Sequence, residues 1–163
     1  MMRARIISWL SSPYLALLFR VCLGVIFVYA GLVKIVDPLG FAHALYNYHI
    51  LPPWMINPLA ICLPWIEVLA GASLLVGIMI SGGALVVSGM LAVFAVAIVV
   101  GLIRGLGIAC GCFSTSASAE PITWLAVVRD LLLLGMGIHI LFFDQGYASL
   151  LRLIQTRLHK ISD

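Results

Sequence analysis

The stretch ALVVSGMLAVFAVAIVVGLI, residues 84–103, contains a single polar side chain, Ser88. A helix needs about 20 mostly apolar residues to cross the roughly 30 Å hydrocarbon core of a bilayer. This stretch therefore predicts a transmembrane helix. The whole chain agrees, because 64% of its residues are hydrophobic and only 9% are charged. Soluble domains have roughly 45–50% apolar and about 25% charged residues.

Further apolar runs on both sides of this stretch predict a four-helix membrane protein. The first run could imitate a signal peptide, but it is too long and is interrupted by Arg20, which favours a retained helix. The length of 163 residues leaves no room for a second domain beside four spans. We expect an all-α antiparallel bundle over residues 14–143, with spans at about 14–35, 58–80, 84–103 and 122–143. Residues 1–13 are predicted to form an interfacial segment, and residues 144–163 an amphipathic cytoplasmic tail.

Prolines, glycines and aromatic residues predict the connections between the spans. Asp37-Pro38 ends the first span, because proline pushes the preceding residue out of helical geometry. Aromatic and polar side chains mingle between Phe41 and Trp54, as they do at the headgroup level of a membrane. We expect that segment to lie along the membrane surface, partly as a helix. Ser81-Gly82-Gly83 is predicted to be a minimal turn between antiparallel neighbours.

The distribution of Lys and Arg predicts the orientation, because these residues are in excess on the cytoplasmic side. Lys34 and Arg104 lie with the two longer loops, whereas five others lie near the termini: Arg3, Arg5, Arg152, Arg157 and Lys160. Both termini are therefore expected in the cytoplasm of a bacterium, with the protein spanning the inner membrane in contact with lipid. No basic stripe accompanies the net charge of +3, so no nucleic-acid partner is expected.

Four charged residues fall within the predicted spans: Arg20, Glu67, Arg129 and Asp130. Each costs about 2.5–3.5 kcal/mol on insertion scales unless it is paired. A rise of about 1.5 Å per residue puts Glu67 and Arg129 at the same depth, so we expect these two to pair. Two interpretations stay open: buried pairs that fix the helix register, or a polar cavity for a substrate, a quinone or a proton.

The polar interval between the third and fourth spans, RGLGIACGCFSTSASAE (residues 104–120), carries Cys110 and Cys112. On the predicted periplasmic side, such a pair is stable as a disulfide or exchanges with other thiols. We therefore regard both cysteines as candidate catalytic residues. Arg104 is the nearest cation that could stabilise a thiolate, and Lys34 is the other cation predicted on this side.

The cysteines have two other interpretations. His43 and His49 could complete a zinc site with them, although the spacing of the two cysteines is shorter than is usual for zinc ligands, and we predict no metal. Alternatively, the two cysteines could be inert loop residues. Cys22 and Cys62 lie within predicted spans, where packing as small apolar side chains is the simpler role.

A family resemblance is carried by motifs that occur in this order: Arg20-Val-Cys-Leu-Gly24-Val-Ile-Phe27-Val-Tyr-Ala-Gly31-Leu-Val-Lys34, Asp37-Pro38 with Phe41, Tyr48-His-Ile-Leu-Pro52, Leu63-Pro64-Trp65-Ile-Glu67 with Gly71, Cys110-Gly-Cys112-Phe113, and Trp124 with Arg129-Asp130. The earlier motifs resemble the DoxX-like membrane proteins, and the last two narrow the resemblance to the MauE branch. Ser114 departs from the pattern, which has a glycine there.

The resemblance implies a four-helix inner-membrane protein associated with redox maturation. In methylamine utilisation, the MauE branch is linked to processing of the disulfide-rich small subunit of methylamine dehydrogenase. Together with the predicted oxidising compartment and the glycine-rich cysteine loop, we expect thiol–disulfide exchange with a periplasmic thioredoxin-like protein or a secreted client that contains disulfides. Such an exchange would be the activity of a thiol–disulfide oxidoreductase. Net oxidation would need an electron acceptor such as a quinone. The alternative function is a non-catalytic membrane chaperone or small-molecule carrier that uses the charged cavity.

Overall fold

The structure, a computed structural model, describes residues 12–105 and 123–144. That part of the chain is helical, with α2 (Pro13–Val36), α3 (Pro38–Asn47), α4 (Pro53–Val76), α5 (Ile80–Ile103) and α6 (Trp124–Phe143). Four of these helices, all but the short α3, are long and apolar enough to cross a membrane. The expected all-α architecture with four spans is confirmed. The cytoplasmic location of the termini stays a prediction.

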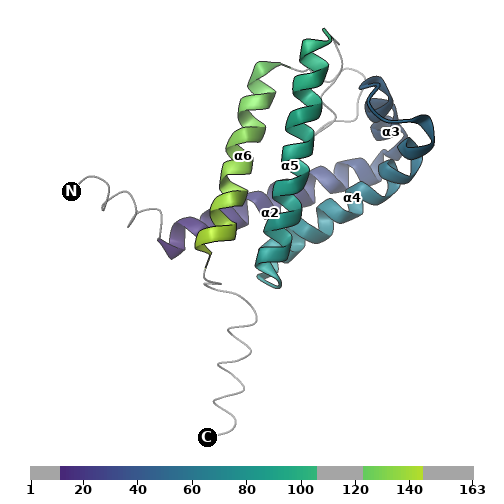
Figure 1. Cartoon of the computed structure of the whole chain (residues 1–163). Coiled ribbons are helices and arrows are strands. Elements are labelled where there is room, and N and C mark those ends of the chain that lie inside the picture. The colour runs from purple at the N-terminus through teal and green to yellow at the C-terminus, as the bar shows by residue number, and fades with distance from the viewer. Residues whose placement is uncertain (1–11, 106–122, 145–163) are drawn as a thin grey trace, which may run out of the picture.

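The four long helices form two pairs, as Figure 1 shows. Helices α2 and α4 lie side by side, and the α5–α6 pair crosses them at a steep angle. Successive spans run in opposite directions, so α3, the end of α5 and the start of α6 lie at one end of the molecule. The connection that contains Cys110 and Cys112 lies outside the described residues. Its two ends, after α5 and before α6, lie at this same end of the molecule.

Glycine allows α2 and α4 to approach each other closely. A Cβ atom added at Gly71 of α4 would lie 2.8 Å from the carbonyl oxygen of Gly24 and 2.9 Å from the backbone nitrogen of Val28, both in α2. Membrane helices associate through such small-residue contacts, because lipid supplies no hydrophobic driving force between them. The α2–α4 contact is therefore a backbone-to-backbone packing that side chains would prevent.

Helices α4 and α5 begin earlier than the predicted second and third spans, whereas α5 ends at Ile103 as predicted. Helix α4 begins at Pro53, because proline is compatible with the first turn of a helix. It ends at Val76, and the following Gly77 has a φ of 76°, the left-handed conformation that terminates many helices. The turn between α4 and α5 therefore precedes the predicted Ser81-Gly82-Gly83, which lies inside α5.

The segment after α2 contains a helix, as expected from its mixed composition. Helix α2 ends at Val36, and the side chain of Asp37 caps α3 by accepting a hydrogen bond from the backbone N–H of Gly40 at 2.9 Å. Phe41 of α3 is 1% exposed. Helix α3 is thus packed against the spans through this ring and places it near the polar residues described next.

Candidate functional site: a buried ionic cluster beside an apolar groove

Lys34 and Glu67 form a buried ion pair between α2 and α4. The Nζ atom of Lys34 donates to Oε1 of Glu67 at 2.6 Å and to Oε2 at 2.8 Å. The two residues are 2% and 1% exposed. Removing a charge from water costs several kcal/mol, so such residues are retained within a membrane only where they are paired. Lys34, which was predicted to lie with the outer loops, is a buried residue of the last turn of α2.

Two aromatic rings flank the ammonium group of Lys34. Its Nζ atom lies 5.1 Å from the ring centroid of Phe41 and 5.3 Å from that of Phe94. Cation–π attraction at these distances strengthens when the cation is desolvated. Helices α3 and α5 therefore each contribute one ring to the environment of a charge that α2 carries.

Asp130 of α6 contributes a second carboxylate to the site. Its Oδ1 atom accepts from Nε of Arg129 at 3.2 Å and from Nη2 at 3.0 Å. Asp130 is 2% exposed, whereas the Arg129 side chain is 39% exposed. In the part of the chain that the structure describes, Oδ2 of Asp130 is buried without a hydrogen-bond partner. A buried carboxylate oxygen of this kind is a strong acceptor for a water molecule or a proton donor.

A small cavity joins these polar groups. It has a volume of about 20 Å³ and is lined by Lys34, Glu67 and Asp130 together with apolar residues that include Phe94. Such a volume is about what one water molecule needs, and the three polar side chains offer it donors and acceptors. The spans α2, α4 and α6 thus converge on a position where a proton or a small polar group can be held away from bulk water.

The predicted pairing of Glu67 with Arg129 was wrong. Glu67 forms an ion pair with Lys34, and Arg129 pairs with its sequence neighbour Asp130. Depth along the membrane indicated which residues were level, but not which helix faces were opposed. Because α2 packs directly on α4, the nearest cation to Glu67 comes from α2.

Arg20 belongs to a different site. Its Nη1 atom lies 3.6 Å from Oδ2 of Asp144, the residue that follows α6, and both side chains are 2% exposed. Arg20 and Asp144 are near the start of α2 and the end of α6, so this pair lies at the opposite end of the molecule from α3. The four charged residues predicted as one intramembrane site are therefore divided between two places.

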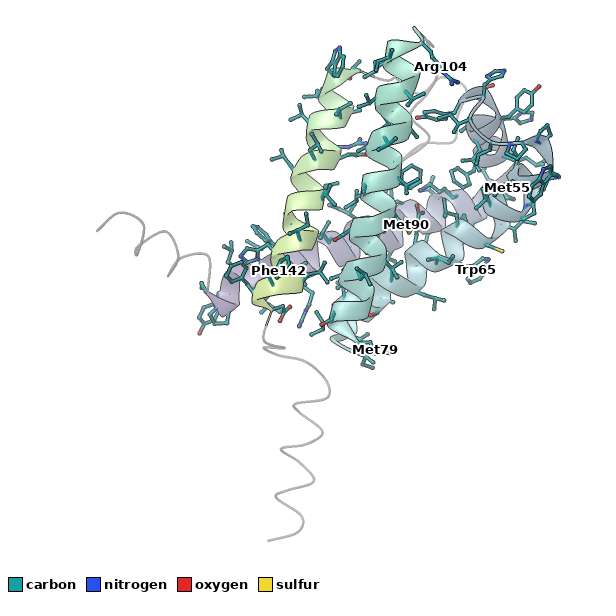
Figure 2. All side chains as sticks on the ribbon, viewed as in Figure 1. Met55, Trp65, Met79, Met90, Arg104 and Phe142 are labelled. Atoms are coloured by element: carbon teal, nitrogen blue, oxygen red, sulfur yellow. The ribbon has the colours of Figure 1, made fainter. Side chains whose placement is uncertain are left out.

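Arg104 lies where the cysteine-bearing connection begins. Figure 2 shows it at the end of α5 with its side chain directed toward the α3–α4 region, and its Nη1 atom donates to the carbonyl oxygen of His49 at 3.4 Å. This contact joins the end of α5 to the α3–α4 loop. Cys110 and Cys112 themselves lie outside the described residues, as does any zinc site that they would form with His43 and His49. Cys22 is half-buried and Cys62 is exposed, and neither forms a disulfide.

The burial of Lys34 is indicated by the spacing of the residues around it in the sequence. Gly24, Phe27, Gly31 and Lys34 are three or four residues apart, which places them on one face of a helix. All four are buried. A lysine on the same helix face as the close-packing glycines is expected inside the bundle. No sequence pattern near Phe94 indicated its role or the presence of the cavity.

A comparison with known proteins identifies the family. The family model described as methylamine utilisation protein MauE matches residues 12–143. The chain is 30% identical over 134 residues to methylamine utilization protein MauE of Paracoccus denitrificans, covering 82% of this chain and 72% of that protein. It is 29% identical over 134 residues to its namesake in Methylophilus methylotrophus, covering 82% and 70%. No solved structure matches the chain. The MauE resemblance seen in the sequence is thereby confirmed, and this four-span membrane protein belongs to the MauE family.

Proposed function

We propose that this protein acts in methylamine utilisation as an inner-membrane protein that exchanges disulfides with a periplasmic client through Cys110 and Cys112. The relatives named for methylamine utilisation support the process. The position of the α5–α6 connection is the main support for the site. The connection with the cysteine pair joins α5 to α6 at the end of the molecule where Arg104 meets His49.

The exchange proceeds by two sulfur substitutions. A thiolate of the client attacks one sulfur of the Cys110–Cys112 disulfide, forming a mixed disulfide and releasing the other cysteine as a thiolate. A second client thiolate then attacks the mixed disulfide, so the client leaves oxidised and the pair becomes a dithiol. The two electrons that the client loses are those that the pair gains. Arg104, at the start of the connection, is the cation proposed to favour the thiolate form.

The periplasmic location of the pair rests on the distribution of Lys and Arg. Lys34 was counted with the outer loops, but it is a buried residue of α2, so Arg104 alone is counted against the five cations near the termini. That change strengthens the charge bias, because buried residues of a span do not count toward loop charge. We therefore place both termini in the cytoplasm and the cysteines on the oxidising side.

Trapping the exchange intermediate tests the proposal. In intact cells, thiols are blocked with a bulky maleimide before and after a pulse of reductant, and the gel shift of the protein is read. The wild-type pair should change between reduced and oxidised forms. One of the two variants Cys110→Ser and Cys112→Ser should accumulate a mixed disulfide, with Cys62→Ser as a control that leaves the pair intact. A pair that never changes state, with neither variant trapping a partner, would exclude thiol exchange.

The buried cluster favours a second candidate, a membrane chaperone or small-molecule carrier. Lys34, Glu67 and Asp130, from α2, α4 and α6, line a small cavity between the spans. A carrier would keep supporting growth on methylamine when both Cys110 and Cys112 are serine, in a host lacking its own MauE. It would lose that activity on Glu67→Gln or Asp130→Asn. Thiol exchange predicts loss in the double serine variant.

A further inference from the structure

A half-open apolar groove lies between α4, α5 and the residues around the end of α3. Its volume is about 410 Å³, within the range of pockets that hold small organic ligands, roughly 300–1,000 Å³. Leu45 and Tyr48 line it from the α3 side, Leu63 from α4, and Gly89 and Val93 from α5. Val93 is 69% exposed, as expected of a residue that faces lipid. The groove is therefore open to molecules that arrive through the bilayer.

Phe94 separates this groove from the buried ionic cluster. Phe94 lines both the apolar groove and the small cavity bounded by Lys34, Glu67 and Asp130. The ring centroid lies 5.3 Å from Nζ of Lys34. A lysine ammonium has three N–H donors, and Lys34 donates to the two carboxylate oxygens of Glu67. A ligand in the groove could displace Phe94 or stack beside it. It would then meet the Lys34 donor and the carboxylates of Glu67 and Asp130.

We propose that the groove binds an isoprenoid quinone, with its ring beside Phe94 and its chain directed to the bilayer. A quinone combines a planar ring, two carbonyl acceptors and an apolar chain, which matches an aromatic wall, a lysine donor and an apolar opening. A phospholipid fits less well, because its charged phosphate stays at the membrane surface and the hydrocarbon tail beyond its ester carbonyl has no acceptor for Lys34. The two carboxylates beside the lysine suit the proton changes of quinone reduction.

As an electron acceptor, the quinone deepens the proposed function and in that role rests on it. The Cys110–Cys112 dithiol would lose two electrons and two protons on becoming a disulfide. The quinone would gain two electrons and two protons on becoming a quinol. Binding itself needs neither cysteine, so it can be tested separately.

A matched pair of glycine variants tests the groove. An added Cβ at Gly89 or at Gly135 meets no atom within 4 Å, so both helices accept a side chain, but only Gly89 lines the groove. The full chain is placed in nanodiscs and titrated with decylubiquinone, following saturable quenching of tryptophan fluorescence. Gly89→Leu should weaken binding by roughly tenfold or more, because leucine occupies the groove. Gly135→Leu should bind within about twofold of wild type. Equal binding by Gly89→Leu and wild type would overturn the proposal.

A second arm tests recognition of the quinone ring. Decylbenzene has the same chain without the carbonyls, and wild type should bind it roughly tenfold more weakly than decylubiquinone. The variant with Lys34→Met and Glu67→Met should lose that preference. If decylbenzene or phosphatidylglycerol competes with decylubiquinone for the groove at equal affinity, the groove holds acyl chains and the quinone assignment is wrong.

The two proposals fail separately. The variant with both Cys110 and Cys112 replaced by serine should bind decylubiquinone as wild type does. Binding with this pattern, together with no redox change of the cysteines, would leave the quinone site and remove thiol exchange. Trapped mixed disulfides together with unchanged quinone binding by Gly89→Leu would support thiol exchange and remove the quinone site.

Discussion

The Nζ atom of Lys34 lies 2.6 Å from Oε1 of Glu67, and this contact joins α2 to α4 inside a membrane protein. Each residue comes from a helix that is otherwise apolar enough to span a bilayer. The pair lies at the centre of a cluster. The rings of Phe41 and Phe94 flank the Lys34 ammonium, and Asp130 lines the same cavity as the pair.

Replacing one partner of this pair should be more harmful than replacing both. Lys34→Met leaves a buried carboxylate without its cation and should destabilise the protein by about 3–5 kcal/mol. Lys34→Met combined with Glu67→Met keeps similar volume without charge, so most of that stability should return. Thermal unfolding of the purified protein in detergent measures the difference. If the double variant is no more stable than the single one, the pair does not act as a unit.

Exchanging the two charges of a pair tests whether Glu67 pairs with Lys34 or with Arg129, the residue predicted at the same depth. Lys34→Glu with Glu67→Lys should restore part of the accumulation lost in either single variant, because the two side chains touch. Glu67→Arg with Arg129→Glu should not, since Arg129 is bonded to Asp130. Immunoblots of membrane fractions report the accumulation. Rescue by the second exchange, with none by the first, would contradict the pairing.

Phe41 should matter to stability far more than its neighbour on α3. Phe41→Ala removes a ring that is 1% exposed and should cost about 3–5 kcal/mol. Leu39→Ala on the same helix is the matched control, because Leu39 is 75% exposed and should cost little. Phe41→Leu keeps most of the packing but loses the contact with Lys34, and should fall between them. Thermal unfolding gives the order, and equal losses for the two alanine variants would deny α3 a packing role.

Small residues should be essential where α2 meets α4 and dispensable on the open side of α5. Gly71→Ala places a Cβ 2.8 Å from a backbone oxygen of α2, so the helices must separate, at a cost of about 1–3 kcal/mol. Gly89→Ala meets no atom within 4 Å and should be neutral or stabilising by up to about 1 kcal/mol, because alanine favours helix. The retention of monodisperse protein after heating in detergent tests this contrast. A tolerant Gly71 would mean that the backbones are not in contact.

The length and composition of the apolar runs determined the number and type of elements. Whether a stretch spans a bilayer depends on its own residues, so the four spans were predictable from the sequence. The end of α2 before Pro38 was equally local, because proline constrains its own neighbour. The turn after α4 was missed, since several glycines were available and Gly77 was the one that took the left-handed conformation.

The partners of the buried charges were decided only by the tertiary structure. Sequence position gives the depth of Glu67, but its partner depends on how α4 is rotated and which helix lies against it. The close contact through Gly24 and Gly71 sets that rotation and brings Lys34 to Glu67. Phe94 likewise stands between a polar cavity and an apolar groove only because α5 crosses the α2–α4 pair. Spans are fixed by local hydrophobicity, whereas the site arises from side chains far apart in the sequence that helix packing brings together.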